Sequence, residues 1–401
     1  MNDLDRLMTD RGIGLLIVPL HDTGDPSFRW ISRGAKLTHG FVAKRPNGEA
    51  ELIHFPMERD EARASGLRTV SALDLGWDRF AKESDDAGEL HARFFRSLIG
   101  ENLEGSLAIL GNGPITLYHS ILGRLSREGF EIWEGTDDLI QTARKKKDER
   151  EIELIRETGR RTERIVGELK AKLASASIDE GRLQIDGQDL TIGHLKDFVS
   201  RRISELGMVE DHETILSQGD EAAVPHSRGS RDRIVRSGET LVIDIFPADR
   251  ASGYFFDYTR TLVAGEPPDR VRQLHAQVLE AFELAVDSCR AGMAASELQH
   301  LVCDFFESKG HATTRSDPST TNGYVHGLGH GVGLEVHEKP SFSINSSNDD
   351  RIESGDVLTI EPGLYYPEER IGIRIEETFV VGSDGRLESM CEASRGLAVD
   401  R

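Results

Sequence analysis

Residues 324–340 read YVHGLGHGVGLEVHEKP, and this stretch decides the fold of the second half of the chain. It places His326, His330 and His337 within twelve residues. Glycine at every second position from 327 to 333 disfavours a helix, so the HExxH helix of thermolysin-type zinc enzymes is absent. A dinucleotide-binding GxGxxG loop is also a poor match, because a histidine interrupts the glycines. The glycines predict close approach of the backbone to other atoms, and the histidines predict a site.

Upstream, a carboxylate interrupts each of two apolar strand-like segments. LVIDIF contains Asp244, and GYFFDYTRTLV contains Asp257, 13 residues later. A charged group in an apolar strand costs on the order of several kcal/mol unless it is paired, protonated or metal-bound. Period-two alternation places Asp257 and Thr259 on one face and Arg260 on the other. The spacing suits two neighbouring strands that aim both carboxylates at one point.

The same design recurs downstream. VLTIEPG ends an apolar run at Glu361, and IGIRIEETFVV, residues 371–381, carries Glu376, 15 residues later. We read 371–381 as one alternating strand with Glu376 and Arg374 on one face. Glu377 falls on the other face, which is otherwise apolar: Ile371, Ile373, Ile375, Phe379 and Val381.

Four carboxylates on four apolar strands would repel one another wherever they met. A pair of divalent metal ions relieves this repulsion, because bridging carboxylates suit two ions about 3.5–4 Å apart. Together with the histidine-rich stretch between them, the four carboxylates predict a dinuclear metal site.

The first third of the chain alternates strand and helix signals, which predicts a layered α/β domain over residues 1–145. Its strands are expected at 13–19, at 41–55 as a hairpin around Pro46-Asn47-Gly48, and at 68–75, 106–111 and 130–134, and its helices at 57–65, 88–100 and 116–127. No catalytic constellation stands out in it.

A dense charge run, RKKKDEREIE at 144–153, marks the expected domain boundary. Both signs are mixed, so we interpret the run as a solvated linker that leads into a long helix rather than as a binding patch. The second domain, 146–401, shows a helix pair, a strand block, a second helix pair and a second strand block, which suggests a duplicated half-domain.

Composition restricts the class of protein further. The chain has 401 residues and a net charge of −21, which argues against nucleic acid and anionic lipid as partners. Three cysteines indicate no disulfide framework and a reducing compartment. No apolar run approaches the ~20 residues of a membrane span, and the N-terminus lacks the pattern of a signal peptide. We therefore expect a soluble, cytoplasmic protein.

Five segments, in order, carry a family resemblance: LVIDIF, GYFFDYTRT, HGLGHGVGLEVHE, LTIEPG and GIRIEE. They resemble the metallopeptidase superfamily of methionine aminopeptidase, aminopeptidase P and prolidase. The resemblance covers about 148–401 and implies an α+β catalytic domain of the pita-bread fold. By length and layout, residues 1–145 look like the creatinase/prolidase-type N-terminal domain, which methionine aminopeptidases usually lack.

The resemblance implies a role for each metal ligand by position. Asp244 would chelate one ion, Asp257 and Glu376 would bridge both, and His330 and Glu361 would complete the second. The family pattern selects Glu376 rather than Glu377. One departure is the longer connection Phe246–Ser252 between the two aspartates, which bears on the rim of the pocket more than on the ligands.

The resemblance also implies roles for residues that hold no metal. His226, in AAVPHSRG, matches an active-site histidine, and His337 matches the residue that contacts the substrate carbonyl. His326 would line the proline-side pocket, and Arg374 would support the metal carboxylates. Glu361 would also act as the general base.

The implied activity is hydrolysis of the Xaa-Pro bond with two Mn²⁺, Co²⁺ or Zn²⁺ ions, by a homodimer acting on small peptides. The oxygen-rich ligand set favours Mn²⁺. The alternatives are a creatinase-like hydrolase that works without metal, a lyase on the same fold, and a catalytically silent binding module. The intact set of five ligands weighs against the first and third alternatives, and the motifs leave a lyase open.

Overall fold

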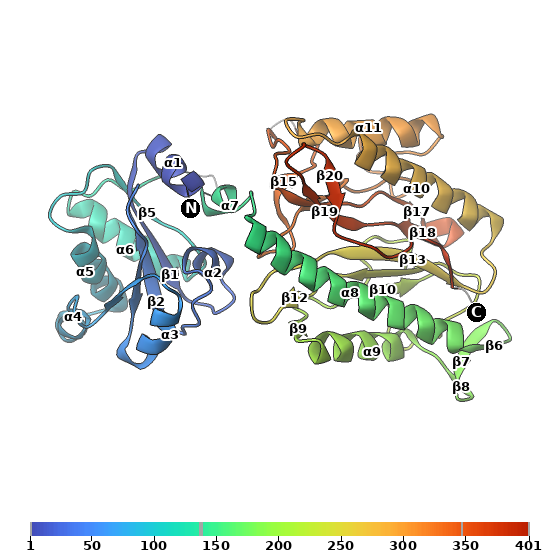
Figure 1. Cartoon of the computed structure of the whole chain (residues 1–401), viewed down its shortest axis with the longest axis horizontal. Helices are drawn as coiled ribbons and strands as arrows, with labels where there is room; N and C mark the ends of the chain where they lie inside the picture. The colour runs from blue at the N-terminus through green and yellow to red at the C-terminus, as the bar shows by residue number, and fades with distance from the viewer. Residues whose placement is uncertain (1, 136–138, 346–347, 400–401) are drawn as a thin grey trace. The chain divides into compact units, whose positions relative to one another are not determined.

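The chain folds as two units, Met1–Arg144 and Lys145–Arg401 (Figure 1), and the computed structural model describes residues 2–135, 139–345 and 348–399. The elements of the first unit are α1 (Asn2–Asp10), β1 (Ile13–Leu20), α2 (Pro26–Ile31), β2 (Gly40–Lys44), β3 (Glu51–His54), η1 (Pro56–Glu58), α3 (Arg59–Ala64), β4 (Arg68–Ser71), α4 (Trp77–Glu83), α5 (Ala87–Ile99), β5 (Ser106–Ile109), α6 (Ile115–Arg127) and α7 (Leu139–Ala143).

The first unit is a mixed sheet in the order β4-β3-β2-β1-β5, covered on both faces. Side chains of β1 alternate between two cores: Leu16 and Val18 pack with α1 and α2, whereas Leu15 and Ile17 pack with α5 and α6. A strand buried on both faces reads as a continuous apolar run, which explains the sequence of β1. The layered α/β architecture is confirmed.

Local predictions in this unit are mostly confirmed. The hairpin forms between β2 and β3, and Asn47 takes the positive φ of 58° that the turn needs. The strand expected at 130–134 is wrong: within the described residues, this segment makes one bridge, between Ile132 and Leu107. The predicted helices of this unit do not include the short helices α1, α2, α4 and α7. Asp25 caps α2 ahead of Pro26, which is a helix-start signal, but this helix has only six residues.

The second unit has longer helices and more strands. Its helical elements are α8 (Glu149–Ser175), α9 (Ile192–Glu205), α10 (Asp269–Ser288), α11 (Ala295–Ser308) and η2 (Pro367–Glu369). Its strands are β6 (Ser177–Asp179), β7 (Arg182–Ile185), β8 (Gln188–Asp189), β9 (Met208–Val209), β10 (Ile215–Gln218), β11 (Leu241–Ile245), β12 (Ala248–Asp249), β13 (Tyr258–Ala264), β14 (His330–Gly331), β15 (Glu338–Ser341), β16 (Val357–Ile360), β17 (Gly363–Tyr366), β18 (Ile371–Arg374), β19 (Glu377–Val381), β20 (Leu387–Ser389) and β21 (Ala398–Val399).

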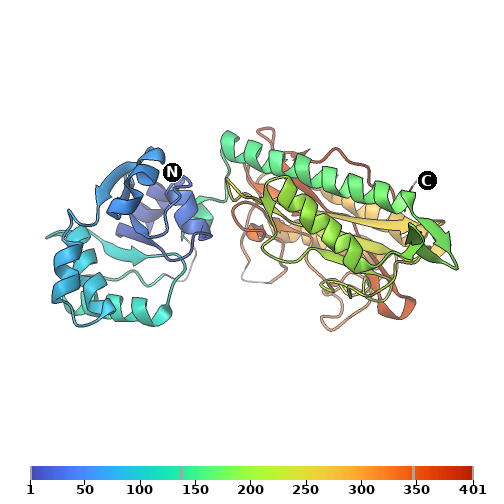
Figure 2. The ribbon, with the colours of Figure 1, turned by 90° about the horizontal axis from the view of Figure 1, so that it is seen from below.

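Two helix pairs flank the larger sheets of this unit. Figure 1 shows β13, β17, β18 and β19 lying between α8–α9 and α10–α11, with β6, β7 and β8 beyond the end of α8, and Figure 2 shows α8 and α9 side by side on one face. The larger sheets are β10-β11-β13-β21 and β15-β14-β16-β19-β20. This arrangement of helix pairs and sheets agrees with the expected pita-bread fold.

The segment 371–381 is not one continuous strand, as the sequence suggested. It breaks after Arg374, so that β18 pairs with β17 whereas β19 pairs with β16. The predicted apolar face is nevertheless confirmed, because its five residues all lie in one buried core: Ile371, Ile373, Ile375, Phe379 and Val381. The chain therefore changes sheets at Glu376 while its alternation of faces persists.

The charge run at the boundary is the clearest correction. Lys145 and Lys147 are buried rather than solvated, with overall exposures of 7% and 6%. Lys147 pairs with Glu338, and Lys145 pairs with Asp356 and Glu353. Two lysines of the charge run therefore form buried ion pairs. The sequence alone does not distinguish such lysines from those of a solvated linker. Within the described ranges, no helix is both long and apolar enough to cross a membrane.

A buried histidine makes this unit sensitive to acid. His311 lies between the hydroxyl of Tyr366 and the amide oxygen of Gln277, and burial, aided by Arg270, lowers its pKa. The unfolded chain then binds more protons than the folded chain below pH ~6.5, so folded-state stability from this group is lost as pH falls through that value. We expect His311→Asn to flatten the pH dependence of the unfolding free energy between about pH 6.5 and 5.

Urea unfolding at several pH values measures this slope. His300→Asn, at an exposed position on α11, is the control and should leave the slope unchanged. An unaltered slope in His311→Asn would show that His311 does not titrate on unfolding.

Candidate metal centre

The two aspartates lie at the same level of neighbouring strands. Asp244 is in β11, paired with Thr259 of β13, and Asp257 directly precedes β13. Both aspartates are buried, with exposures of 8% and 4%. Thr378 holds the backbone of Asp257, accepting from its N–H and donating to its carbonyl. The predicted strand pair is thus present, and the two β-strand ends orient the aspartates.

The two glutamates lie where the second group of strands meets the first. Glu361 follows β16, and Glu376 occupies the break between β18 and β19. The backbone of Glu376 pairs with that of Thr259, whose hydroxyl donates to Glu376 Oε2 at 2.6 Å. The change of sheets at this point therefore brings Glu376 to the aspartates.

His330 is held in the tautomer that a metal ligand needs. Its Nδ1–H donates to the carbonyl of Gly331 at 3.1 Å, which leaves the lone pair on Nε2. Nε2 lies 3.6 Å from both Asp257 Oδ2 and Glu361 Oε1. Burial lowers the pKa of His330 to about 3, so the ring is neutral at physiological pH. The lone pair on Nε2, beside two carboxylates, is therefore available to bind a metal ion.

The ligand atoms of Asp257, His330 and Glu376 lie within 4.8 Å of one another. Burial, followed by the charge of Glu376, raises the pKa of Asp257 and of Glu361, and burial with the charge of Asp244 raises that of Glu376. These shifts express the electrostatic cost of gathering carboxylates in a buried place, which bound cations would remove.

The donor set fits divalent metal ions. Asp244 Oδ1 and Asp257 Oδ1 are buried, and neither has a hydrogen-bond partner among the residues described. Buried polar atoms without partners are rare, and here two of them belong to the group of carboxylates around His330. Oxygen donors with a single imidazole suit ions such as Mn²⁺.

Arg374 connects the ligands to the surrounding polar residues. Its guanidinium donates to Asp244 Oδ2 at 2.5 Å, to the hydroxyl of Thr259 at 3.3 Å and to the hydroxyl of Tyr365 at 2.7 Å. The Tyr365 hydroxyl in turn lies 3.1 Å from Nε2 of His326, whose Nδ1–H donates to a backbone carbonyl. The network orients Asp244 and His326 together, in keeping with the supporting role that the resemblance implies for Arg374.

His337 and His226 are the exposed members of the predicted set. The ring of His337 stands nearly perpendicular to that of His330, with 4.3 Å between centroids. Partial burial lowers the pKa of His337, and Asp244 opposes this shift. His226 follows Pro225, whose carbonyl accepts from the guanidinium of Arg374 at 3.4 Å, and the charge of His226 lowers the pKa of both His326 and His337. The structure therefore gathers all nine predicted residues, whose roles stay predictions.

Sequence reasoning missed two residues of this network. Thr259 links Arg374 to Glu376, and its place on the Asp257 face was the available signal. Tyr365 gave no comparable signal, since it is one of two adjacent tyrosines on an apolar strand. Glu377 faces away from the ligands, as the alternation predicted, and the structure pairs it with Arg260.

The glycines around His330 let its backbone lie against two strands. A Cβ at Gly329 would lie 2.1 Å from the carbonyl oxygen of Thr359, and one at Gly331 would lie 2.0 Å from that of Lys339. At Gly327 a Cβ would meet nothing within 4 Å. The predicted close approach is thus confirmed at the two glycines that flank His330.

Alanine substitutions test this packing. Gly329→Ala and Gly331→Ala should lower the free energy of unfolding by about 1–3 kcal/mol through overpacking, and should weaken metal binding by moving His330. Gly327→Ala is the control and should retain both properties. Urea unfolding and metal titration measure them, and wild-type behaviour of Gly331→Ala would contradict the packing described.

Known proteins are similar to this chain in sequence and in fold. The chain is 32% identical over 254 residues to the Xaa-Pro dipeptidase of Pyrococcus furiosus, a match covering 62% of this chain and 64% of that protein. It is 28% identical over 367 residues to the Xaa-Pro dipeptidase of Pyrococcus horikoshii, covering 90% and 89%. The crystal structure of the prolidase from Pyrococcus horikoshii superposes with a TM-score of 0.75 at 25% identity, covering 98% of both chains. The sequence profile of metallopeptidase family M24 matches residues 153–383, a range that holds all nine predicted site residues, and the chain belongs to this family.

Proposed function

We propose that the protein hydrolyses the peptide bond between any residue and a following proline, in dipeptides or at the N-terminus of longer peptides. The observation that carries this proposal is the convergence of Asp257, His330 and Glu376 on one buried point. Relatives named Xaa-Pro dipeptidase support the choice of bond.

Membership of family M24 implies divalent metal ions. In our proposal Asp244, Asp257 and Glu376 hold them from one side, and His330 and Glu361 complete the set. Mn²⁺ is the ion we propose first, with Co²⁺ and Zn²⁺ as alternatives. When bound, such ions polarise a carbonyl and lower the pKa of a water molecule.

The residues of the chain supply the proton transfers and the orientation. Glu361 accepts a proton from the attacking water and delivers it to the leaving nitrogen. His337, with His226, donates hydrogen bonds to the oxygen that becomes negatively charged. His326, fixed by Tyr365, lines the pocket for the proline ring. The bond to proline has no N–H, so a site that needs no hydrogen bond from that group is suited to it.

Hydrolysis of Gly-Pro and Gly-Pro-Pro by EDTA-treated protein with Mn²⁺ restored tests the function. Cleavage of the dipeptide alone would identify a dipeptidase, and release of the first residue from the tripeptide would identify an aminopeptidase. Metal binding with cleavage of neither peptide would refute the Xaa-Pro assignment and leave the metal site standing.

We further propose that the protein is a cytoplasmic homodimer. The family resemblance supports the dimer, and the three free cysteines support a reducing compartment. Sedimentation equilibrium tests the dimer: a mass near twice 44.5 kDa supports it, and a mass near 44.5 kDa refutes it.

A further inference from the structure

Lys147, near the start of the second unit, forms a buried ion pair with Glu338, which lies 191 residues later in the chain. Lys147 Nζ donates to Glu338 Oε2 at 2.8 Å, and each side chain is only 1% exposed. Replacing such a pair by apolar side chains often leaves stability unchanged, because desolvation offsets the attraction between the charges. Its presence therefore calls for a role other than stability.

Glu338 organises the turn that presents His337. Its Oε1 accepts the backbone N–H of Glu335 at 3.0 Å, and its carboxylate lies so close to Gly333 that a Cβ there would be 2.5 Å from Oε2. One carboxylate thus contacts both the beginning and the middle of the turn 333–338. His337 is the residue next to Glu338, and its exposed ring depends on this turn for its place beside His330.

Lys147 is held firmly enough to fix that carboxylate. Its backbone N–H donates to the carbonyl of Gly355 at 2.8 Å, and its Nζ also donates to the carbonyl of Lys145 at 3.0 Å. The next residue, Asp148, forms a capping box with Glu151 at the start of α8. The position of Lys147 is therefore set by its main chain on both sides.

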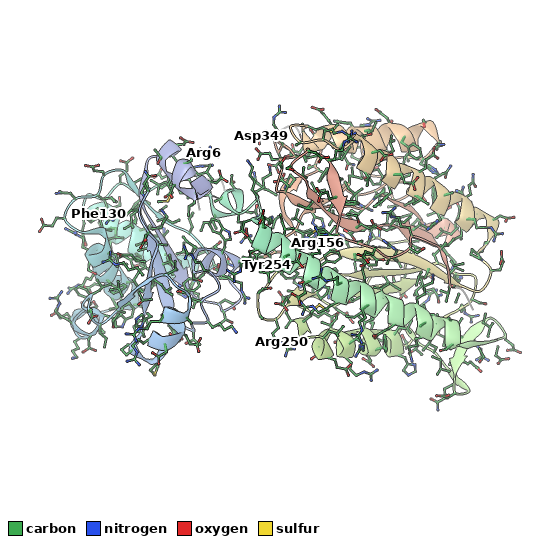
Figure 3. All side chains as sticks on the ribbon, viewed as in Figure 1. Arg6, Phe130, Arg156, Arg250, Tyr254 and Asp349 are labelled. Carbon is green, nitrogen blue, oxygen red and sulfur yellow. The ribbon has the colours of Figure 1, made fainter. Side chains whose placement is uncertain are left out.

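The same end of α8 also contacts the segment between the two aspartates. Tyr254, labelled in Figure 3 beside the N-terminal part of α8, donates from its hydroxyl to Glu151 Oε1 at 2.6 Å. The neighbouring Phe255 donates its N–H to the carbonyl of Gly333 at 2.8 Å. The turn 333–338 is thus held by Glu338, whose partner is Lys147, and by Phe255, whose neighbour Tyr254 binds Glu151. Lys147 and Glu151 both lie at the start of α8 or just before it.

We propose that Lys147 is a positioning residue for the reaction, acting through Glu338 to fix the imidazole of His337. The inference rests on the proposed function in that His337 contacts the reacting peptide. The residues that affect the reaction would then include Lys147, in a segment that the sequence predicted to be a solvated linker.

Lys147→Met tests the proposal against Lys145→Met in the full-length chain. Both variants remove a buried lysine that faces a buried carboxylate, but the partner of Lys145 at 3.1 Å is Asp356, outside the turn 333–338. We expect both to lower the midpoint of thermal unfolding. Lys147→Met should also lower kcat about tenfold or more at little changed KM and metal content, because small displacements at a reacting centre are costly. Lys147→Arg should recover part of the loss.

A double variant separates positioning from stability. In Lys147→Met with Glu338→Leu, both charges vanish together, so the unfolding midpoint should recover whereas kcat should stay low. Recovery of kcat along with stability would overturn the proposal, as would equal kcat in Lys147→Met and Lys145→Met.

A second readout does not depend on peptide cleavage. The side-chain NMR signals of His337, assigned by their loss in His337→Gln, should shift in Lys147→Met and not in Lys145→Met. Unshifted signals in Lys147→Met would refute the positioning role. If the wild-type protein cleaves no Xaa-Pro peptide, the proposed function fails while this test of Lys147 still gives its answer.

Discussion

Glu376→Gln and Asp257→Asn are each expected to abolish metal loading and Xaa-Pro cleavage together. Both side chains are almost fully buried, and each amide keeps the size of the carboxylate but removes its negative charge. The loss in kcat should be roughly 10³-fold or more, since bound ions contribute several kcal/mol to stabilising the transition state. Metal analysis by mass spectrometry and the Gly-Pro assay measure the two effects on one sample.

Glu377→Gln is the matched control for Glu376→Gln. Glu377 is the adjacent residue and is also buried, but it pairs with Arg260 at 2.5 Å and Arg395 at 2.6 Å on the opposite face. Its substitution should lower the free energy of unfolding by about 3–5 kcal/mol, because it breaks buried ion pairs, while the metal content of the folded protein is retained. Full metal content in Glu376→Gln, or none in folded Glu377→Gln, would reverse the assignment of the two neighbours.

Arg374→Met is expected to give the largest loss of stability in the site. The variant leaves Asp244 as a buried carboxylate without its cation and also removes the donors to Thr259 and Tyr365. Breaking a buried pair from one side costs about 3–5 kcal/mol, and Arg374→Lys should recover only part because an ammonium lacks the fork of donors. Urea unfolding of metal-stripped and metal-loaded protein measures the loss.

Arg370→Met provides the comparison. Arg370 lies four residues earlier and pairs with Asp220 at 3.2 Å, but both side chains are more than half exposed. Its loss should cost no more than about 1 kcal/mol, as for other surface pairs. Equal losses in Arg374→Met and Arg370→Met would show that burial of the Arg374 network does not determine stability.

Alternation of side chains is the part of the fold and site that sequence predicted well. The period of two along 371–381 places Glu376 toward the ligands and Glu377 toward Arg260. It holds through the break between β18 and β19, although the partner strand changes there from β17 to β16. A local pattern can thus fix the face of a residue without fixing its sheet.

What sequence could not predict depends on contacts between distant residues. The partners of Lys145 and Lys147 lie about 190–210 residues away, so nothing local showed that their charges are buried. Tyr365 joins Arg374 to His326 only once β17 and β18 have paired. Segment 130–134 has the composition of a strand but makes a single bridge to the part of the chain that the structure describes, because pairing is decided by the neighbouring strand rather than by propensity.

Titration of metal-stripped protein with Mn²⁺, followed for bound metal and for Gly-Pro cleavage in the same samples, tests the central claim most directly. We expect two ions bound per chain, as the family resemblance implies, with cleavage rising as they bind and neither effect in Glu376→Gln. Cleavage that persists in the metal-stripped protein, or metal binding that is unchanged in Glu376→Gln, would contradict the assignment of these residues to a dinuclear hydrolytic site.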